Sequence, residues 1–317
     1  MRHSVQSAPT PPETTFKLRP GHPFAREVRR ILLEQVDRAL WQLTTPHLPV
    51  DPAVHDARKC FKRIRGVLRL VRDDIGPERF AQLNALFRDA GRALSDIRTS
   101  AVLGETLTKV HERYPDQLSE DEASRLVARL QAHHAALRDD VLPQARLFEQ
   151  VAAELQRGRA LIEQLPLHGD YFPAAGMARV YARGRSGLKR CQKDPSVPNF
   201  HEWRKRVKYL RYHVRIFSPT WPPVLASVTE ELVTLSELLG LDHDLADLHR
   251  TLTEHPELRL RGPEQGKTVR LIEAYRKELE ARSFSIGLRV YAEKPDDFVR
   301  RMRAYWRAWR DEWDDGR

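Results

Sequence analysis

The sequence predicts an all-α protein, and three observations support this fold class. Apolar residues recur at helical spacing in several long segments, for example at Val28, Ile31, Leu32 and Val36. No stretch alternates between apolar and polar residues for long enough to predict a strand. The 317 residues are 41% hydrophobic, which is sufficient for one large domain or two lobes.

The first half of the chain is expected to contain a polar tail followed by helices. Residues 1–20 are proline-rich and polar, so we expect them to be disordered. Helices are predicted at about 23–43, from 52 to Gly76, at about 77–113, and over 119–165 with a break at Pro143. Asp51 is expected to cap the second of these helices, with Pro52 at its first position. The stretch 165–169 then connects two predicted halves, 21–165 and 166–317.

The second half is expected to follow the same plan. A helix carrying Arg179, Arg183 and Arg190 precedes a basic segment that Asn199 and Glu202 are expected to open as a capping box. Further helices are predicted at about 223–254, 264–290 and 296–315. In the last one, Trp306, Trp309 and Trp313 are at helical spacing. That pattern is more typical of core packing than of base stacking.

Two segments share one pattern of basic residues. In each, a histidine is followed by Lys or Arg at offsets 3, 4, 7, 10 and 14. In a helix these offsets span an arc of about 120°, and the opposite side of each segment is apolar. We call these sets the first basic stripe (His55, Arg58, Lys59, Lys62, Arg65 and Arg69) and the second basic stripe (His201, Arg204, Lys205, Lys208, Arg211 and Arg215).

The charge balance places the basicity of the chain in these two segments. Residues 55–72 carry a net charge of +6 and residues 201–215 carry +5, within a chain total of +10. We expect neither segment to interleave acids at i±4, so both should keep their charge. Both histidines are expected near a first helical turn, where free backbone N–H groups favour an anion. This concentration of like charge predicts a polyanionic ligand.

The paired H-x-x-R-K-x-x-K-x-x-R-x-x-x-R segments resemble the CHAD domain, a family named for its conserved histidines and helical content. The likeness covers roughly residues 21 to 317 and includes the segment around His243 and Asp244. In the matching first-half element, Arg98 is followed by Thr99 where the family has an aspartate. Tyr181-Ala-Arg183-Gly-Arg185 resembles the family's Y-x-R-x-R segment.

This resemblance implies two helical bundles related by a pseudo-twofold, with a basic groove between them, and binding of inorganic polyphosphate. The predicted contacts are both basic stripes, Arg98 and His243, with Arg179, Arg183 and Arg190 in the second half and Arg26 and Arg30 in the first. We expect a binding protein with no catalytic step, no cofactor and no resident metal. Its expected location is the cytoplasm, where it could associate with polyphosphate granules. The oligomeric state stays open.

Two enzyme classes are alternatives to this binding function. Gly262-Pro-Glu-Gln-Gly266-Lys267-Thr268 resembles a nucleotide-binding P-loop, but it has three residues between its glycines instead of four and lacks a preceding strand. Asp242, His243, Asp244 and Asp247 include metal-ligand types and so leave open a metal-dependent enzyme acting on polyphosphate or phosphorylated substrates. In the binding alternative, His243 contacts phosphate while these acids orient it or cap the helix.

A third alternative is a general nucleic-acid or polyanion-binding module. Both stripes lack Asn and Gln, and their aromatic neighbours fall mainly on the apolar side, so nothing in them predicts base reading.

No apolar run is long enough to cross a membrane. Cys60 and Cys191 form no CxxC pair, which argues against a disulfide framework. His55 and His201 predict polyphosphate binding that strengthens as pH falls from 8 to 6.

Overall fold

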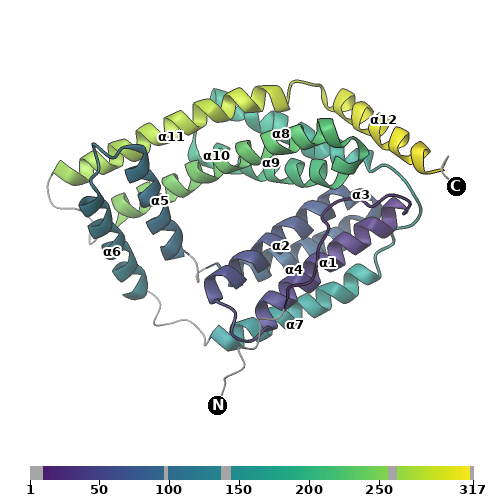
Figure 1. The fold of residues 1–317 in the computed structure, drawn as a ribbon, viewed down its shortest axis with the longest axis horizontal. Coiled ribbons are helices and arrows are strands. Elements are labelled where there is room, and N and C mark those ends of the chain that lie inside the picture. The colour runs from purple at the N-terminus through teal and green to yellow at the C-terminus, as the bar shows by residue number, and fades with distance from the viewer. Residues whose placement is uncertain (1–9, 96–98, 137–143, 256–262, 315–317) are drawn as a thin grey trace, which may run out of the picture. The chain divides into compact units, whose positions relative to one another are not determined.

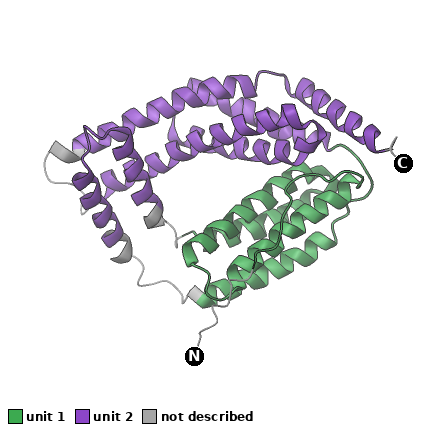
Figure 2. Cartoon of the chain, in the orientation of Figure 1, with its two compact units in different colours: residues 1–97, 142–172 green, residues 98–141, 173–317 purple. Residues whose placement is uncertain are grey.

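The structure, a computed structural model, describes residues 10–95, 99–136, 144–255 and 263–314 (Figure 1). Within those ranges every regular element is a helix, which confirms the predicted all-α fold class. None of these described helices is long and apolar enough to span a bilayer. The chain divides into two compact units, coloured separately in Figure 2: unit 1 holds residues 1–97 and 142–172, and unit 2 holds residues 98–141 and 173–317.

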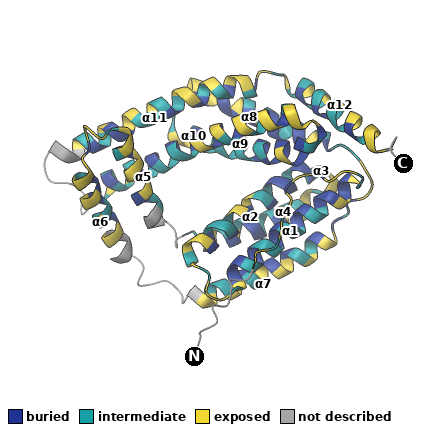
Figure 3. Ribbon diagram, in the orientation of Figure 1, coloured by how far each residue is buried: buried dark blue, intermediate teal, exposed yellow. Residues whose placement is uncertain are grey.

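In unit 1, four long helices pack in a closed ring, each against two of the others, and one short helix is added. The long helices are α1 (Phe24–Thr44), α2 (Val50–Leu70), α4 (Pro77–Ala93) and α7 (Gln144–Glu163), and the short one is α3 (Arg72–Ile75). Both α1 and α4 pack against α2 and α7. The fully buried side chains of this core include Val28, Ile31, Ile64, Phe87 and Leu155. Figure 3 colours each position along the ribbon by its burial.

Unit 2 contains a second ring of four helices with additions. The ring consists of α8 (Ala174–Lys193), α9 (Val197–Phe217), α10 (Pro222–Glu254) and α11 (Pro263–Val290). The turn η1 (Ser218–Thr220) joins α9 to α10, and α12 (Pro295–Asp314) packs against α8. The pair α5 (Thr99–Arg113) and α6 (Glu120–Ala136) attaches through α5 to α10 and α11.

The two rings share one order of contacts. In each, the first helix packs against the second and the fourth, and the third packs against the same two. Each basic stripe lies on the second helix of its ring, α2 or α9. This common order agrees with the repeated sequence pattern, while the pseudo-twofold, the groove between the halves and the halves themselves stay predictions.

The predicted continuous helix over 77–113 is wrong, because two helices occupy this range. At the end of α4 the N–H and the hydroxyl of Ser95 both donate to the carbonyl of Arg92, which closes the helix. The next helix, α5, belongs to unit 2, where Leu107 and Val110 are buried in a cluster with Leu245 of α10. The apolar spacing continues across this break and therefore does not reveal it.

Both helices that carry the stripes begin earlier than predicted. α2 starts at Val50 and α9 at Val197, and neither has a side-chain N-cap hydrogen bond. The Asn199 amide instead donates to the carbonyl and carboxylate of Asp194, at 3.0 and 2.8 Å. His55 and His201 therefore lie in second turns, where backbone N–H groups bond within the helix. The predicted anion site on first-turn N–H groups is wrong for both.

The segment before α1 differs from the predicted disordered tail. Phe16 and Leu18 are each only 4% exposed, and the main chain from Thr15 to Arg19 bonds to α1. We call residues 15–19 the N-terminal strap. Its polar composition predicted disorder, but two apolar side chains and the acids of α1 hold it in place.

The connecting stretch after α7 also stabilises α1. Asp170 accepts a hydrogen bond from the N–H of Phe24 at 2.8 Å, and Arg29 donates to the carbonyl of Leu165 at 2.8 Å. Asp170 therefore caps the start of α1 from 146 positions away. Local sequence does not predict such a cap.

The tryptophans of α12 behave only partly as predicted. Trp309 is 7% exposed and packs into the unit, as expected, while Trp306 is half-buried. Trp313 is 42% exposed, so the prediction that it packs in the core is wrong. It lies in the last turn of α12, beyond the buried Phe298 and Met302.

Candidate functional site

The helix α9 buries its apolar side and leaves its basic side partly open. Trp203, Val207 and Leu210 are at most 1% exposed, whereas Arg215 is exposed and the rest of the second stripe is half-buried. A Cβ placed on Gly287 of α11 would lie 2.6 Å from Cζ2 of Trp203, so the indole fits only because that position lacks a side chain. This packing fixes which way the cations of α9 face.

His201 and His243 meet at the start of the second stripe. Their Nδ1 atoms are 3.4 Å apart, and Nε2 of His243 lies 3.4 Å from a carboxylate oxygen of Asp247. Burial lowers the pKa of both imidazoles, reinforced by Arg204, and the pKa of His243 falls to about 3. The pair is therefore neutral at pH 7, and an anion bound beside it would favour its protonation.

Arg204 lies between α9 and α10 with incomplete hydrogen bonding. Its Nε is buried and has no hydrogen-bond partner among the described residues, and a Cβ on Gly240 would lie 3.7 Å from one of its terminal nitrogens. Burial lowers the pKa of Arg204, while Asp244 and Asp247 oppose that shift. An incompletely bonded buried guanidinium is a group that gains from an added phosphate oxygen.

The remaining acid of this α10 segment belongs to an internal network. Asp242 is 2% exposed and accepts from Arg276 of α11 at 2.9 Å, and Arg276 also reaches Glu280 at 3.4 Å. Burial raises the pKa of both acids, and that of Glu280 reaches about 7. In the part of the chain that the structure describes, no group of three His, Cys, Asp or Glu residues could hold a metal ion.

One acid in each stripe segment corrects the expectation that the stripes lack neutralising carboxylates. Asp56 pairs with Lys59 at 3.1 Å, and Glu202 pairs with Lys205 and Arg206. Both acids directly follow the stripe histidine, and the lysine is three residues further on. The first turn of each stripe is therefore partly neutralised by its own helix.

Further along, two stripe arginines contact neutral groups. Arg65 donates to the amide oxygen of Asn84 at 3.1 Å. The guanidinium of Arg211 lies 5.2 Å from the centre of the Tyr212 ring. Such contacts orient the two guanidinium groups and keep their charge.

The first stripe on α2 separates its arginines from its lysines. Arg58 donates to the carbonyl of Leu94 at 2.9 Å, and Arg69 donates to the carbonyl of Arg65 at 2.6 Å. Lys59 and Lys62 are exposed. Neighbouring backbone thus positions Arg58 and Arg69, while the two lysines are more exposed. His55 is half-buried, and its Nδ1 is buried with no hydrogen-bond partner among the described residues.

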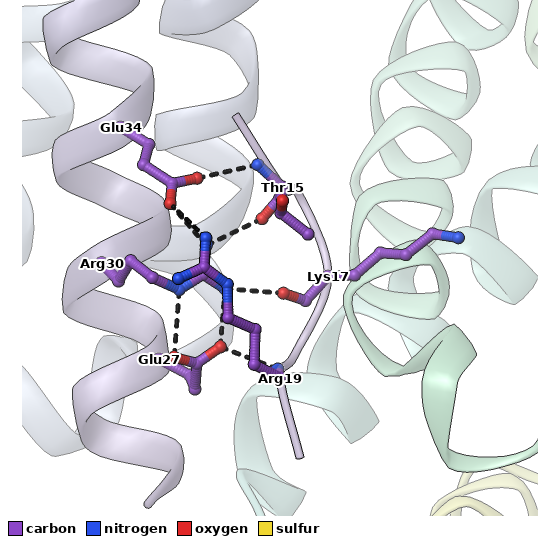
Figure 4. A network of polar contacts seen from close by, with 6 residues as sticks. All are labelled: Thr15, Lys17, Arg19, Glu27, Arg30 and Glu34. Carbon is purple, nitrogen blue, oxygen red and sulfur yellow. Dashed lines mark hydrogen bonds and ion pairs between the residues drawn. The ribbon is translucent and has the colours of Figure 1, made fainter. Parts of the chain in front are cut away.

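The candidates outside the stripes are placed unevenly. On α8, Arg183 and Arg190 are exposed and Arg179 is half-buried. On α1, Arg26 is exposed, but Arg30 is enclosed by the carboxylates of Glu27 and Glu34 and by two carbonyls of the strap (Figure 4). We therefore leave Arg30 out of the binding surface proposed below.

Two predicted positions cannot be located in the site. Arg98 lies outside the described residues, and so does the side chain of Thr99. The first-half counterpart of His243 and Asp244 thus stays a prediction.

Sequence reasoning missed two cations beside the stripes. Arg63 of α2 donates to Gln35 at 3.1 Å, and its guanidinium lies 5.5 Å from the centre of the Phe16 ring. Burial raises the pKa of Asp244 on α10, and Lys109 of α5 is among the cations that oppose this rise, so Lys109 lies within electrostatic reach of Asp244. Arg63 could have been predicted from the sequence, because it is a basic residue just outside the arc of the first stripe. The position of Lys109 could not, because α5 was expected to continue α4.

The P-loop-like segment is part of a helix. α11 begins at Pro263, so Gly266, Lys267 and Thr268 lie within its first turns, and Thr268 is 2% exposed. A helix cannot wrap a phosphate as a glycine-rich loop does. Gly262 lies outside the described residues, so the rejection of a nucleotide-binding P-loop stays a prediction.

Comparison with known proteins gives one family and two similar structures. A family model described as the CHAD domain matches residues 30–253. PptA from Streptomyces chartreusis has a TM-score of 0.52 at 15% identity, over 86% of this chain and 100% of that chain. The crystal structure of the CHAD domain from the plant Ricinus communis has a TM-score of 0.50 at 21% identity, over 96% and 98%. No curated protein matches the sequence significantly.

Proposed function

The chain belongs to the CHAD-domain family, and from this premise we propose that it binds inorganic polyphosphate through its two basic stripes without catalysing a reaction on it. One observation carries the proposal. On both α2 and α9 the apolar side of the repeat is buried, while every stripe cation is half-buried or exposed. The family resemblance supplies the identity of the ligand, and the stripes supply the chemistry.

The stripes suit a linear chain of phosphates. A row of cations along a helix can bind successive phosphate groups through charge alone, as cations bind a nucleic-acid backbone. Arg offers paired N–H donors to two phosphate oxygens, whereas Lys offers a compact charge that tolerates sliding. Arg204 is largely buried and packs close to Gly240, and Arg211 lies against the ring of Tyr212, so little conformational entropy is lost when they bind.

The aromatic residues of α9 favour polyphosphate over nucleic acid. Trp203, Tyr209 and Tyr212 are at most 8% exposed and offer no open ring face for a base. The stripes also contain no Asn or Gln that could read base edges. Polyphosphate lacks bases and needs neither feature.

The polar partners of the second stripe support a positioning role for the α10 residues. Asp247 lies beside His243, and Asp242 is bonded to Arg276. In the proposed function these acids orient cations and the imidazole instead of activating water. Recruitment of the protein to polyphosphate granules would follow from such binding.

Charge reversal on both stripes tests the proposal. Lys62→Glu with Arg211→Glu should weaken polyphosphate binding at least tenfold, because each change removes an attraction and adds a repulsion. Lys294→Glu with Arg307→Glu is the matched control, since both residues are exposed and lie outside the stripes. Equal affinities of the two variants, with unchanged helicity by circular dichroism, would contradict the proposal.

Two further measurements separate the alternatives. Competition between long-chain polyphosphate and single-stranded nucleic acid at one salt concentration should favour polyphosphate. Incubation with polyphosphate and Mg²⁺ or Mn²⁺ should leave chain length unchanged. Stronger binding of nucleic acid would favour the general polyanion module, and chain shortening would favour the enzyme.

A further inference from the structure

The N-terminal strap is held on α1 by four hydrogen bonds between its main chain and side chains of α1. Arg30 donates to the carbonyls of Thr15 and Lys17, at 3.0 and 2.7 Å. Glu34 accepts from the N–H of Thr15 at 2.9 Å, and Glu27 accepts from the N–H of Arg19 at 2.8 Å. Side chains of α1 thus supply hydrogen-bond partners to the main chain of the strap, as a neighbouring strand does in a sheet (Figure 4).

Burial and charge make this arrangement specific. Arg30 bridges Glu27 and Glu34 at 2.6 and 2.7 Å, and Glu27 is only 2% exposed. A buried carboxylate needs such a partner, because an unpaired buried charge is costly. The same three side chains that neutralise one another therefore fix the path of the strap.

The strap also reaches the helix of the first stripe. Phe16 and Leu18 are buried, while Lys17 between them lies at a bend and is exposed. The Phe16 ring lies under the guanidinium of Arg63 at 5.5 Å, and Arg63 is one helical turn from Lys59 on α2. Lys17, the next residue, is exposed and points away from α1 in Figure 4.

We propose that the N-terminal strap is part of the polyphosphate-binding surface, with Lys17, the neighbour of the Phe16 that contacts Arg63 of α2, as a binding residue and Arg30 as the residue that positions it. This inference rests on the proposed function. Among the described residues, the ammonium group of Lys17 forms no hydrogen bond or ion pair, so its charge is available. The strap precedes residue 30, where the family match begins.

The role of Arg30 changes accordingly. The resemblance implied direct contact with polyphosphate, but its guanidinium is occupied by two carboxylates and two carbonyls. It acts on the ligand through Lys17. Loss of Arg30 should release the strap and with it the binding contribution of Lys17.

Lys17→Ala tests the binding role. We expect affinity for long-chain polyphosphate to fall about three- to tenfold, and the slope of log affinity against log salt to fall by roughly 0.7. The melting temperature should not change, because the Lys17 side chain is exposed. Lys294→Ala, which removes an exposed lysine elsewhere, is the matched control and should leave affinity unchanged.

Arg30→Met tests the positioning role. Hydrogen exchange at the amides of Thr15 and Arg19 should accelerate, and affinity should fall as in Lys17→Ala. The double variant should bind no more weakly than Arg30→Met alone, because a released strap no longer presents Lys17. Should Arg30→Met fail to fold, deletion of residues 1–19 takes its place with the same expected loss of affinity.

The outcomes separate this inference from the proposed function. If Lys62→Glu weakens binding and Lys17→Ala binds like Lys294→Ala, the strap has no binding role and the proposed function stands. If Lys62→Glu with Arg211→Glu also binds like its control, both ideas fail. Additive losses in Lys17→Ala and Arg30→Met would contradict positioning through Lys17.

Discussion

The imidazoles of His201 and His243 are in contact with each other, near Arg204. With their Nδ1 atoms 3.4 Å apart, they cannot both carry a proton on the facing nitrogens without repulsion. Burial and the nearby cations lower the pKa of both groups. A phosphate group reverses that balance, because its negative charge stabilises imidazolium. Binding should therefore be coupled to proton uptake.

The pH dependence of binding tests this coupling. The pKa of His201 is lowered in the free protein and should be higher when an anion is bound, so affinity should rise as pH falls through the bound-state value. We expect the rise to continue below pH 6 in the parent protein. It should be weaker in a His55→Gln, His201→Gln double variant. The same pH dependence in both proteins, measured by titration from pH 8 to 5.5, would remove the histidines from the binding account.

Glu280 offers a separate test of the network behind the second stripe. Burial, with Asp242, raises its pKa to about 7. An acid with a raised folded-state pKa stabilises the fold below its unfolded-state pKa, and this stability is lost as pH rises through 7. Between pH 5.5 and 8 the free energy of unfolding should fall by roughly 1–2 kcal/mol more in the parent than in Glu280→Gln. Urea denaturation at each pH measures this, and Glu231→Gln, at an exposed position, should behave like the parent.

At the scale of the helix, the orientation of α9 depends on how closely α8 and α11 approach Trp203. Cβ atoms added at Gly187 and Gly287 would lie 3.0 and 2.6 Å from the indole ring. The indole is fully buried, so it cannot move outward to make room. The basic stripe faces the other side of the same helix, and packing at Trp203 therefore controls where its cations lie.

Gly287→Ala should disturb this packing. The added methyl group meets the indole and Leu188, and overpacking of this kind costs about 1–3 kcal/mol of unfolding free energy. Gly266→Ala in the same helix is the control, because the nearest neighbour there is the flexible end of Arg270, at 3.3 Å. That substitution should be neutral or stabilise by up to about 1 kcal/mol. Equal thermal stability of the two variants would show that the α9 and α11 contact tolerates the extra volume.

Helix boundaries were predicted correctly where neighbouring residues in the sequence set them. They were predicted incorrectly where contacts with a distant helix set them. The spacing of Val28 to Leu43 predicted α1 closely. The break predicted at Pro143 lies outside the described residues. The end of α4 could not be predicted, because apolar spacing continues into α5 and the partner of α5 is α10. The early start of α9 followed from Pro198 and from Asn199 turning back to Asp194.

At the scale of the whole molecule, the basic stripes could be predicted but their neighbours could not. Offsets along one helix define the stripe, so Lys62 and Arg211 were identified from sequence alone. Arg30 is enclosed by Glu27 and Glu34, three and four residues away on the same helix, whereas the meeting of His201 with His243 and the placement of Lys109 depend on residues far away in the chain. Only the fold brings these residues together. The acids Asp56 and Glu202 were visible in the sequence, but their pairing with the lysines three residues further on was not predicted.

The central claim is that two rows of cations bind a chain of phosphates through charge. It is tested most directly by the salt dependence of polyphosphate affinity in the parent protein and in Lys62→Gln with Arg211→Gln. Each lost phosphate contact should lower the slope of log affinity against log salt by roughly 0.7, so the double variant should lose about 1.4. A slope equal to the parent's, with the fold intact, would contradict the claim that these stripes bind the ligand.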